Sequence, residues 1–236
     1  MKKLLLSFLV AAITTGTAFA QQVNDPNAEV REAKNFHGIN LSSAFDVYLS
    51  QSNEEAVAIS ASEAKNRERI TVKVKDGILY IGFDSKGLRW SSGNKKLKAY
   101  ISFKQIDKLS ISGACDVFIT GIIKADHLTI NLSGASDLKG KIEVNKLAVD
   151  LSGVSDITIS GSAMQLDVES SGASNFKGFD LVTDICNASA SGASDIKITV
   201  NKELSANASG ASDVRYKGAG KITDIKTSGS SSISKG

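Results

Sequence analysis

Acidic residues recur at one position of a short motif that repeats through the second half of the chain. The set comprises Asp116, Asp137, Asp156, Asp195 and Asp213, and Asn175 replaces the acid in one copy. Stacked copies would place these carboxylates about 5 Å apart, so a cation or local hydrogen bonds must offset their repulsion. Some β-roll repeats bind calcium through aspartate, and a calcium ladder is therefore one hypothesis for the row.

The competing interpretation of this row is structural. Calcium takes about 6 to 8 oxygen ligands, and one carboxylate per repeat supplies few of them. The motif lacks the Gly-Gly-x-Gly-x-Asp pattern of calcium-binding repeats, and Asp and Asn commonly fold their side chains onto turn backbone. No arginine is expected in the row, since Arg215 lies two positions past Asp213. We favour the turn-forming role and expect no cofactor.

A serine precedes each glycine of the motif, and its hydroxyl could face a sugar or another polar surface. These positions are Ser133, Ser152, Ser171, Ser191, Ser209 and Ser228. Serine is also a common turn residue, which makes corner geometry the simpler interpretation.

The chain has two cysteines, Cys115 and Cys186. Cys115 belongs to the motif around Gly113, whereas Cys186 aligns with the inward Leu128 position of a coil four repeats later. Four rungs span roughly 20 Å, and a disulfide needs Cα atoms within about 7 Å. We expect two free thiols, with Cys186 buried and inert. Pairing of Cys115 between molecules is the less favoured alternative.

His37 and His127 are the only histidines, and we expect both on the surface. No metal cluster or nucleophilic triad can be drawn around either of them. The catalytic alternative is a polysaccharide-active lyase or hydrolase, because parallel β-helices host such enzymes. Their sites need converging carboxylates and cations, whereas the acids here form a one-dimensional row. We therefore predict no catalytic residues.

The repeated motif is a Ser-Gly-Ala-Ser-Asp corner, and its spacing predicts the fold. Its glycines are Gly113, Gly134, Gly153, Gly172, Gly192 and Gly210, and a degenerate copy follows at Gly229. Successive glycines lie 21, 19, 19, 20, 18 and 19 residues apart. Glycine reaches positive φ without steric cost, so we assign these glycines to the bends.

Apolar residues alternate on both sides of each corner, as expected of β-strands. Leu128, Ile130 and Leu132 precede one corner, and Ile157 and Ile159 follow another. A unit of about 19 residues cannot bury its apolar face alone, so successive coils must stack and pair in parallel at about 4.8 Å. The sequence predicts an all-β, single-stranded parallel β-helix, or β-solenoid, which is right-handed because crossovers between parallel strands nearly always are.

The interior residues of the coils become smaller toward the C-terminus. Leu204, Ala206 and Ala208 stand where earlier coils have larger residues, and the final coil offers Thr223, Ile225 and Thr227. We expect this end to be narrower, looser and more hydrated.

The N-terminal part lacks the motif and is expected to cap the solenoid. Two alternating segments flank Asp76 and Gly77, which predicts an antiparallel β-hairpin. We divide the chain into a signal peptide at 1–20, a flexible lead-in at 21–35, and a solenoid at 36–236 whose N-terminal cap and first coils span 36–108 and whose repeat coils span 109–236.

The first twenty residues have the charged, apolar and small-residue layout of a secretory signal peptide, with cleavage between Ala20 and Gln21. The apolar run is shorter than the roughly 20 residues that span a bilayer, so we expect no membrane span. No cysteine stands at the cleavage point, which argues against a lipoprotein. The predicted location is the periplasm or the cell surface of a bacterium.

The charge of the chain argues against nucleic acid as a partner. The net charge is +3, which becomes +1 (3 − 2) when Lys2 and Lys3 leave with the signal peptide. A nucleic-acid site would need clustered lysine and arginine.

Three features in this order resemble the head GIN domain family of predicted auto-transporter adhesins. They are FHGIN at 36–40, SAFDVYLSQ at 43–51, and the hairpin at 76–77 followed by serial corners. The resemblance extends from about Phe36 to the last corner. It implies a β-solenoid fold and an adhesin role, and it brings no catalytic residues.

We predict an exported, non-catalytic binding or structural module that is adhesin-like and recognises a surface ligand, either a glycan or a protein. We expect a monomer or weak self-association. The alternatives are a polysaccharide-active enzyme and an envelope scaffold that self-associates through the ends of the solenoid.

Overall fold

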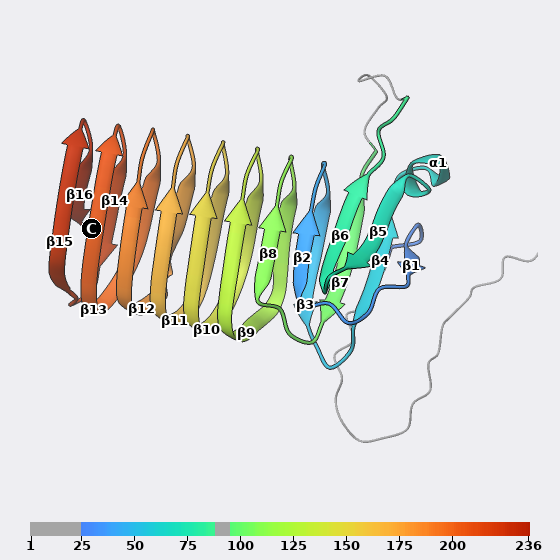
Figure 1. Ribbon diagram of the computed structural model, residues 1–236, viewed down its shortest axis with the longest axis horizontal. Helices are drawn as coiled ribbons and strands as arrows, with labels where there is room; N and C mark the ends of the chain where they lie inside the picture. Colours follow the sequence, from blue (N-terminus) through green and yellow to red (C-terminus); the bar gives the residue numbers. More distant parts are fainter. Residues whose placement is uncertain (1–24, 88–94) are drawn as a thin grey trace, which may run out of the picture.

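The computed structural model describes residues 25–87 and 95–236. The predicted signal peptide, its cleavage point at Ala20 and Gln21, and residues 21–24 lie outside the described residues. The described chain is a rod of stacked β-coils with very little helix (Figure 1).

Sixteen strands in the described residues form one continuous sheet that winds around the rod. The N-terminal strands are β1 (Glu29–Arg31), β2 (Gly38–Leu41), β3 (Asp46–Gln51), β4 (Ala56–Ser60), β5 (Ile70–Lys75), β6 (Ile78–Phe83), β7 (Lys98–Phe103) and β8 (Lys108–Ile111), with the short helix α1 (Ala64–Arg67) before β5. The remaining strands are β9 (Asp116–Leu132), β10 (Asp137–Leu151), β11 (Asp156–Ser170), β12 (Asn175–Ala190), β13 (Asp195–Gly210), β14 (Asp213–Lys217), β15 (Lys221–Gly229) and β16 (Ser232–Lys235).

In the repeat region, β9 to β13 each run from one corner to the next and stack in parallel. Asp137 is in register with Asp116 after the corner, and Leu151 is in register with Leu132 before the next corner. One motif repeat therefore adds one rung to the rod. The prediction of an all-β solenoid with coils of about 19 residues is confirmed.

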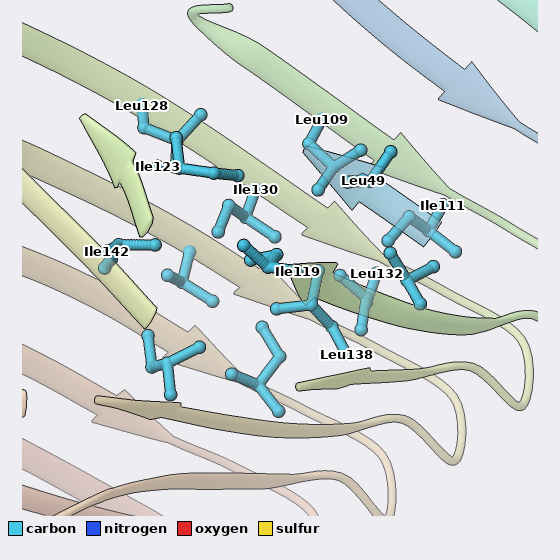
Figure 2. Packing of buried hydrophobic residues seen from close by; sticks show 14 of the residues in the cluster. Leu49, Leu109, Ile111, Ile119, Ile123, Leu128, Ile130, Leu132, Leu138 and Ile142 are labelled. Atoms are coloured by element: carbon cyan, nitrogen blue, oxygen red, sulfur yellow. The ribbon is translucent and has the colours of Figure 1, made fainter. Parts of the chain in front are cut away.

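Alternation along the strands sends every second side chain into the rod. Ile130 and Leu132 of β9 stack on Leu109 and Ile111 of β8, and all four are at most 2% exposed. Figure 2 shows these side chains meeting Leu138 from the other wall of the coil. Burial of each aliphatic side chain contributes about 1.5–3 kcal/mol, so the stacked interior is the main source of stability.

The interior narrows toward the C-terminus, and the last rung departs from simple alternation. A register shift after Leu204 places Ile222, Ile225 and Thr227 over Leu204, Ala206 and Ala208. Thr223 was expected in this layer, and that assignment was wrong. It is the extra residue of the irregularity, and its Oγ1 donates to the Leu204 carbonyl oxygen at 3.1 Å.

The N-terminal rungs stack in an order that differs from their order along the chain. β2 pairs with β6 on one side and with β8 on the other, and β3 likewise lies between β7 and β9. The rung of β6 and β7 therefore lies outside the rung of β2 and β3, although it comes later in the sequence (Figure 1). The chain builds one rung, extends outward to build the next, and then returns to begin the repeats.

Antiparallel strands close the N-terminal end of the rod. β5 and β6 form the predicted hairpin, with Asp76 and Gly77 at φ 51° and 73° in its turn. Positive φ at both central residues is the requirement of the commonest two-residue hairpin turn. On the other wall, β4 pairs antiparallel with β7, and β1 pairs antiparallel with β4.

The expectation of a flexible lead-in over 21–35 is corrected for residues 25–35. β1 joins the sheet edge at β4, and Ala33 is 5% exposed in the core. A polar composition did not predict this pairing, because an edge strand draws its stability from backbone bonds to a neighbour that is distant in sequence.

None of the helices in the described part of the chain is long and apolar enough to cross a membrane.

Candidate binding surfaces

Each corner stacks on the corner of the preceding coil through its backbone. The N–H groups of Val154 and Ala173 donate to the carbonyl oxygens of Gly134 and Gly153 at 2.7 and 2.8 Å. Across the six predicted corners, φ of the glycine lies between 74° and 92°; the residues are Gly113, Gly134, Gly153, Gly172, Gly192 and Gly210. A Cβ on Gly153 would lie 2.5 Å from the Gly134 carbonyl oxygen, so the stacking itself excludes a side chain.

The second serine of the motif is buried, a feature that sequence reasoning missed. Ser136, Ser155, Ser174, Ser194 and Ser212 are each 0% exposed. The Ser155 Oγ donates to the Ser152 carbonyl oxygen three residues earlier at 3.0 Å, and the other copies repeat this bond. The strict recurrence of serine at a second motif position was the available signal.

The first serine of the motif is half-buried. The Ser171 Oγ donates to the Leu151 carbonyl oxygen of the preceding coil at 3.1 Å, and Ser133 and Ser152 make similar contacts. These hydroxyls bind neighbouring backbone, which is the corner geometry favoured over a sugar-facing ladder.

The acidic residues of the motif form a single column on the wall that follows the corners. The register places in one line Asp46, Asp116, Asp137, Asp156, Asn175, Asp195, Asp213 and Ser232. Two neutral members interrupt the charge: the Asn175 Nδ2 donates to Asp156 Oδ1 at 2.7 Å, and the Ser232 Oγ donates to Asp213 Oδ1 at 2.6 Å.

A second column runs beside the acids, two residues further along the strands, and β10, β12, β13 and β14 carry a cation there. Lys177 Nζ lies 2.6 Å from Asp156 Oδ2, and Arg215 Nη2 lies 3.3 Å from Asp213 Oδ2. Arg215 stands outside the acidic row, as expected, but its guanidinium pairs with an acid of that row, which was not expected. A two-residue offset along a strand returns to the same face, so Arg215 lies beside the acid.

The charge of the acidic column is balanced at Asp156 and Asp213, whereas no ion pair engages Asp116, Asp137 or Asp195 among the described residues. Burial raises the pKa of Asp156, but hydrogen bonds from Lys177 and Asn175 outweigh this effect and lower the pKa below its ordinary value. Within the residues that the structure describes, no three His, Cys, Asp or Glu side chains converge as a metal site would require.

Toward the N-terminal end, aromatic residues occupy the positions that cations hold in the later coils. Tyr100, Tyr48 and Phe118 stack along the rod with ring centroids 5.2 and 5.6 Å apart. The Tyr100 hydroxyl donates to Asp25 Oδ2 at 3.0 Å, which ties the segment before β1 to this wall. Burial and the bond to Asp25 raise the pKa of Tyr100 to about 12.

The wall that precedes the corners carries a second outward column, which is polar and mostly uncharged. The register places in one line Tyr80, Asn40, Ser110, Asn131, Asp150, Glu169, Ser189, Asn207 and Lys226. The corner serines border a shallow hollow of about 350 Å³ on this wall. Its lining includes Asn40, Ser110, Asn131 and Asp150.

The side chains in this hollow are free to bind. Among the described residues, no hydrogen bond or ion pair engages the side chains of Asn40, Asn131 or Asp150. Tyr80 is in register with Asn40 and is 42% exposed, so an aromatic ring stands at one end of the polar column. Sequence analysis did not single out these residues, because only the stacking of distant rungs brings them together.

Both cysteines are free and Cys186 is buried, as predicted, and Cys115 is buried as well. Cys115 takes the place of the buried second serine in its corner, and its Sγ lies 3.6 Å from the Ser43 and Ser112 carbonyl oxygens. Cys186 is inward between Leu166 and Leu204. Burial raises the pKa of both thiols, so pairing of Cys115 between molecules is not favoured.

The two histidines lie on the surface, as predicted. The His37 Nδ1 is 3.1 Å from Asp107 Oδ1, and the His127 Nδ1 is 2.6 Å from Asp126 Oδ2. The side chains of His37 and His127 are 59% and 60% exposed. Each imidazole pairs with a single carboxylate at the surface of the rod, and this pair alone does not make a nucleophilic triad.

The chain belongs to the family described as "putative auto-transporter adhesin, head GIN domain", which it matches over residues 35–220. No curated protein matches it at a significant level.

Several solved structures share this fold. A protein of Bacteroides fragilis described as a "putative adhesin" is 25% identical, with a TM-score of 0.81, covering 88% of this chain and 95% of that one. A "putative adhesin" of Parabacteroides merdae is 18% identical, with a TM-score of 0.70 and coverages of 89% and 95%. A "putative lipid binding protein" of Parabacteroides distasonis is 21% identical, with a TM-score of 0.67 and coverages of 90% and 98%.

Proposed function

We propose that this protein is an exported, non-catalytic, adhesin-like module that binds a hydroxyl-rich ligand of the glycan class on the wall before its corners. The observation that carries the proposal is the column of outward Asn, Ser and Asp side chains around the hollow, whose amide and carboxylate groups have no partner among the described residues. Amides donate and accept hydrogen bonds, and carboxylates accept them from hydroxyls. The rigid stacked backbone holds these groups at one-rung spacing, so little entropy is lost on binding.

Tyr80 supports a glycan over a purely polar ligand. Its ring is exposed beside Asn40, and no side chain projects from Gly38 and Gly82, which flank these positions on the same face. An exposed tyrosine offers an apolar face and a polar hydroxyl together, which suits a sugar ring.

The opposite candidate is the charged wall after the corners. There Asp156 and Asp213 already bind Lys177 and Arg215, so a ligand would have to displace internal ion pairs. The polar wall is favoured because its unengaged amide and carboxylate groups, Asn40, Asn131 and Asp150, line one hollow.

A glycan array tests the proposal, followed by titration calorimetry with the strongest hit. The double variant Asn131→Ala/Asp150→Ala should bind that glycan at least tenfold more weakly, because each lost group removes about 1 kcal/mol of hydrogen bonding. Lys197→Ala, on the charged wall, is the matched control and should bind like the parent. Absence of any glycan binding, or equal binding by the double variant, would refute the assignment.

The remaining alternatives make different predictions. A polysaccharide-active enzyme would release reducing ends from the bound glycan, and an adhesin-like module would not.

We also propose residues 1–20 as a signal peptide and residues 36–236 as a single solenoid domain. Cell fractionation with an antibody against the solenoid distinguishes the cell surface from the periplasm.

A further inference from the structure

Within the described residues, β15 and β16 form an edge of the sheet at the C-terminal end of the rod. β15 pairs with β13 and β16 pairs with β14, and within the described residues neither strand has a partner on its outer side. Figure 1 shows this rung at the end of the rod opposite the antiparallel cap. An edge strand with unpaired N–H and C=O groups is a template for another strand.

The open rung also exposes the solenoid interior. Ile222 and Ile225 are 41% and 39% exposed, although they lie over Leu204 and Ala206, which are 0% exposed. These isoleucines belong to the interior stack and lack only the next rung. A further strand at this edge would bury them.

The outward residues of β15 make the strand complementary to itself. Asp224 and Lys226 flank Ile225, and within one chain Asp224 Oδ2 lies 2.8 Å from Lys226 Nζ. If two copies of β15 pair antiparallel with Ile225 opposite Ile225, then Asp224 of each copy faces Lys226 of the other. Four charges then alternate in sign on the outer face.

The N-terminal end fits this edge less well. β5 ends that part of the sheet, and two of its outward residues are Lys73 and Lys75. Two positive residues on one strand cannot both find an acid on β15, where Asp224 is followed by Lys226 and Ser228. When β15 pairs with a second β15, Asp224 and Lys226 each face an opposite charge. A two-fold contact also leaves no unpaired β15 edge, so the assembly stops at two copies.

We propose that two copies of this protein join through their C-terminal rungs, with β15 paired antiparallel to β15 about a two-fold axis at Ile225. The contact is a single sheet edge with a small apolar layer, which places it in the class of weak, reversible interfaces. The joined rod presents two copies of each wall. The inference does not depend on the glycan proposal, because it uses no residue of the hollow.

Light scattering during size-exclusion chromatography of residues 21–236, over a series of micromolar concentrations, tests the dimer. The mass should rise from one to two copies with concentration and then stop. Asp224→Lys should hold the chain monomeric, and Asp224→Lys/Lys226→Asp should restore the dimer, because the exchange keeps every facing pair opposite in charge. Asp184→Lys breaks the exposed ion pair with Lys202 away from the edge and should dimerise like the parent.

Oxidative cross-linking tests the register independently. Ile225→Cys should form an intermolecular disulfide, since residues opposite each other in antiparallel strands have Cα atoms about 4.5–5.5 Å apart. Thr227→Cys faces position 223 and should not cross-link. A monomer at all concentrations, growth beyond the dimer, or failure of the charge exchange to restore pairing would overturn the proposal.

Discussion

The repeat region and the N-terminal end build the same kind of rung by different routes. In the repeat region each rung lies on the rung that precedes it in sequence, and glycine occupies every stacked corner. At the N-terminal end, the rungs of β2 with β3 and β8 with β9 touch in space but are separated by residues 52–107. Their corners nevertheless stack, with the Ala114 N–H donating to the Ser43 carbonyl oxygen at 2.7 Å.

Ser43 shows what makes the corner glycine necessary. It holds the glycine position of the β2–β3 corner at φ 84°, and its Oγ accepts a hydrogen bond from the Phe83 N–H at 3.2 Å. A Cβ on Gly113, the next corner, would lie 2.1 Å from the Ser43 carbonyl oxygen. A serine is tolerated here, where no similar corner of the described residues stacks on the outer side. The bend alone does not demand glycine, but the bend together with stacking does.

The largest effect should come from a side chain placed between two stacked corners. Gly153→Ala should lower the free energy of unfolding by about 3 kcal/mol, because strain at positive φ adds to the clash with the Gly134 carbonyl oxygen. Gly121→Ala has the same kind of φ, 81°, with no atom within 4 Å of the added carbon, and should cost only about 1 kcal/mol. Denaturant titration measures both, and equal losses would show that φ strain alone explains the glycine.

The buried hydroxyl of the corner should have a smaller effect. Ser155→Ala should cost about 1–2 kcal/mol, because the Ser152 carbonyl oxygen loses its buried donor. Cys115→Ser should change stability by less than about 0.5 kcal/mol, since serine fits the same position in the following corners. Thermal unfolding followed by circular dichroism compares the two variants. A Cys115→Ser loss as large as that of Ser155→Ala would show that the first corner differs from the rest.

The Tyr100–Asp25 bond at the N-terminal end should contribute less to stability than the corner glycine or the buried serine. The contribution of this bond to the free energy of unfolding should be complete at neutral pH. That contribution should be lost as pH rises from about 10 toward 12, because the folded-state pKa of Tyr100 is raised to about 12. It should also be lost in acid, below the ordinary Asp value of 3.8, because hydrogen bonds from Asn27, Ser60 and Tyr100 outweigh burial and lower the pKa of Asp25.

Tyr100→Phe should therefore cost about 1 kcal/mol at pH 7 and very little at pH 2. Absorbance at 295 nm should show one phenol with a pKa of about 12 in the parent, and that step should vanish in the variant. An unchanged titration would mean that Asp25 does not hold this ring.

The solenoid was predictable from local pattern, whereas the candidate binding wall was not. Leu128, Ile130 and Leu132 alternate within one strand, so their inward direction follows from strand geometry alone. Asn40 and Asn131 lie 91 positions apart (131 − 40), and they reach one hollow only because β2 and β9 both flank β8. No local signal reports that juxtaposition.

The sequence by itself determined the corners, the coil length and the burial of Cys186, because each depends on residue types that recur at fixed spacing. Only the tertiary structure decided that β6 and β7 lie outside β2 and β3, and that Asn40 and Asn131 line one hollow. The physical reason is that these features depend on which strand edges meet. Backbone hydrogen bonds between strands are the same for every residue type, so the choice among edges is made by the packing of the whole rod.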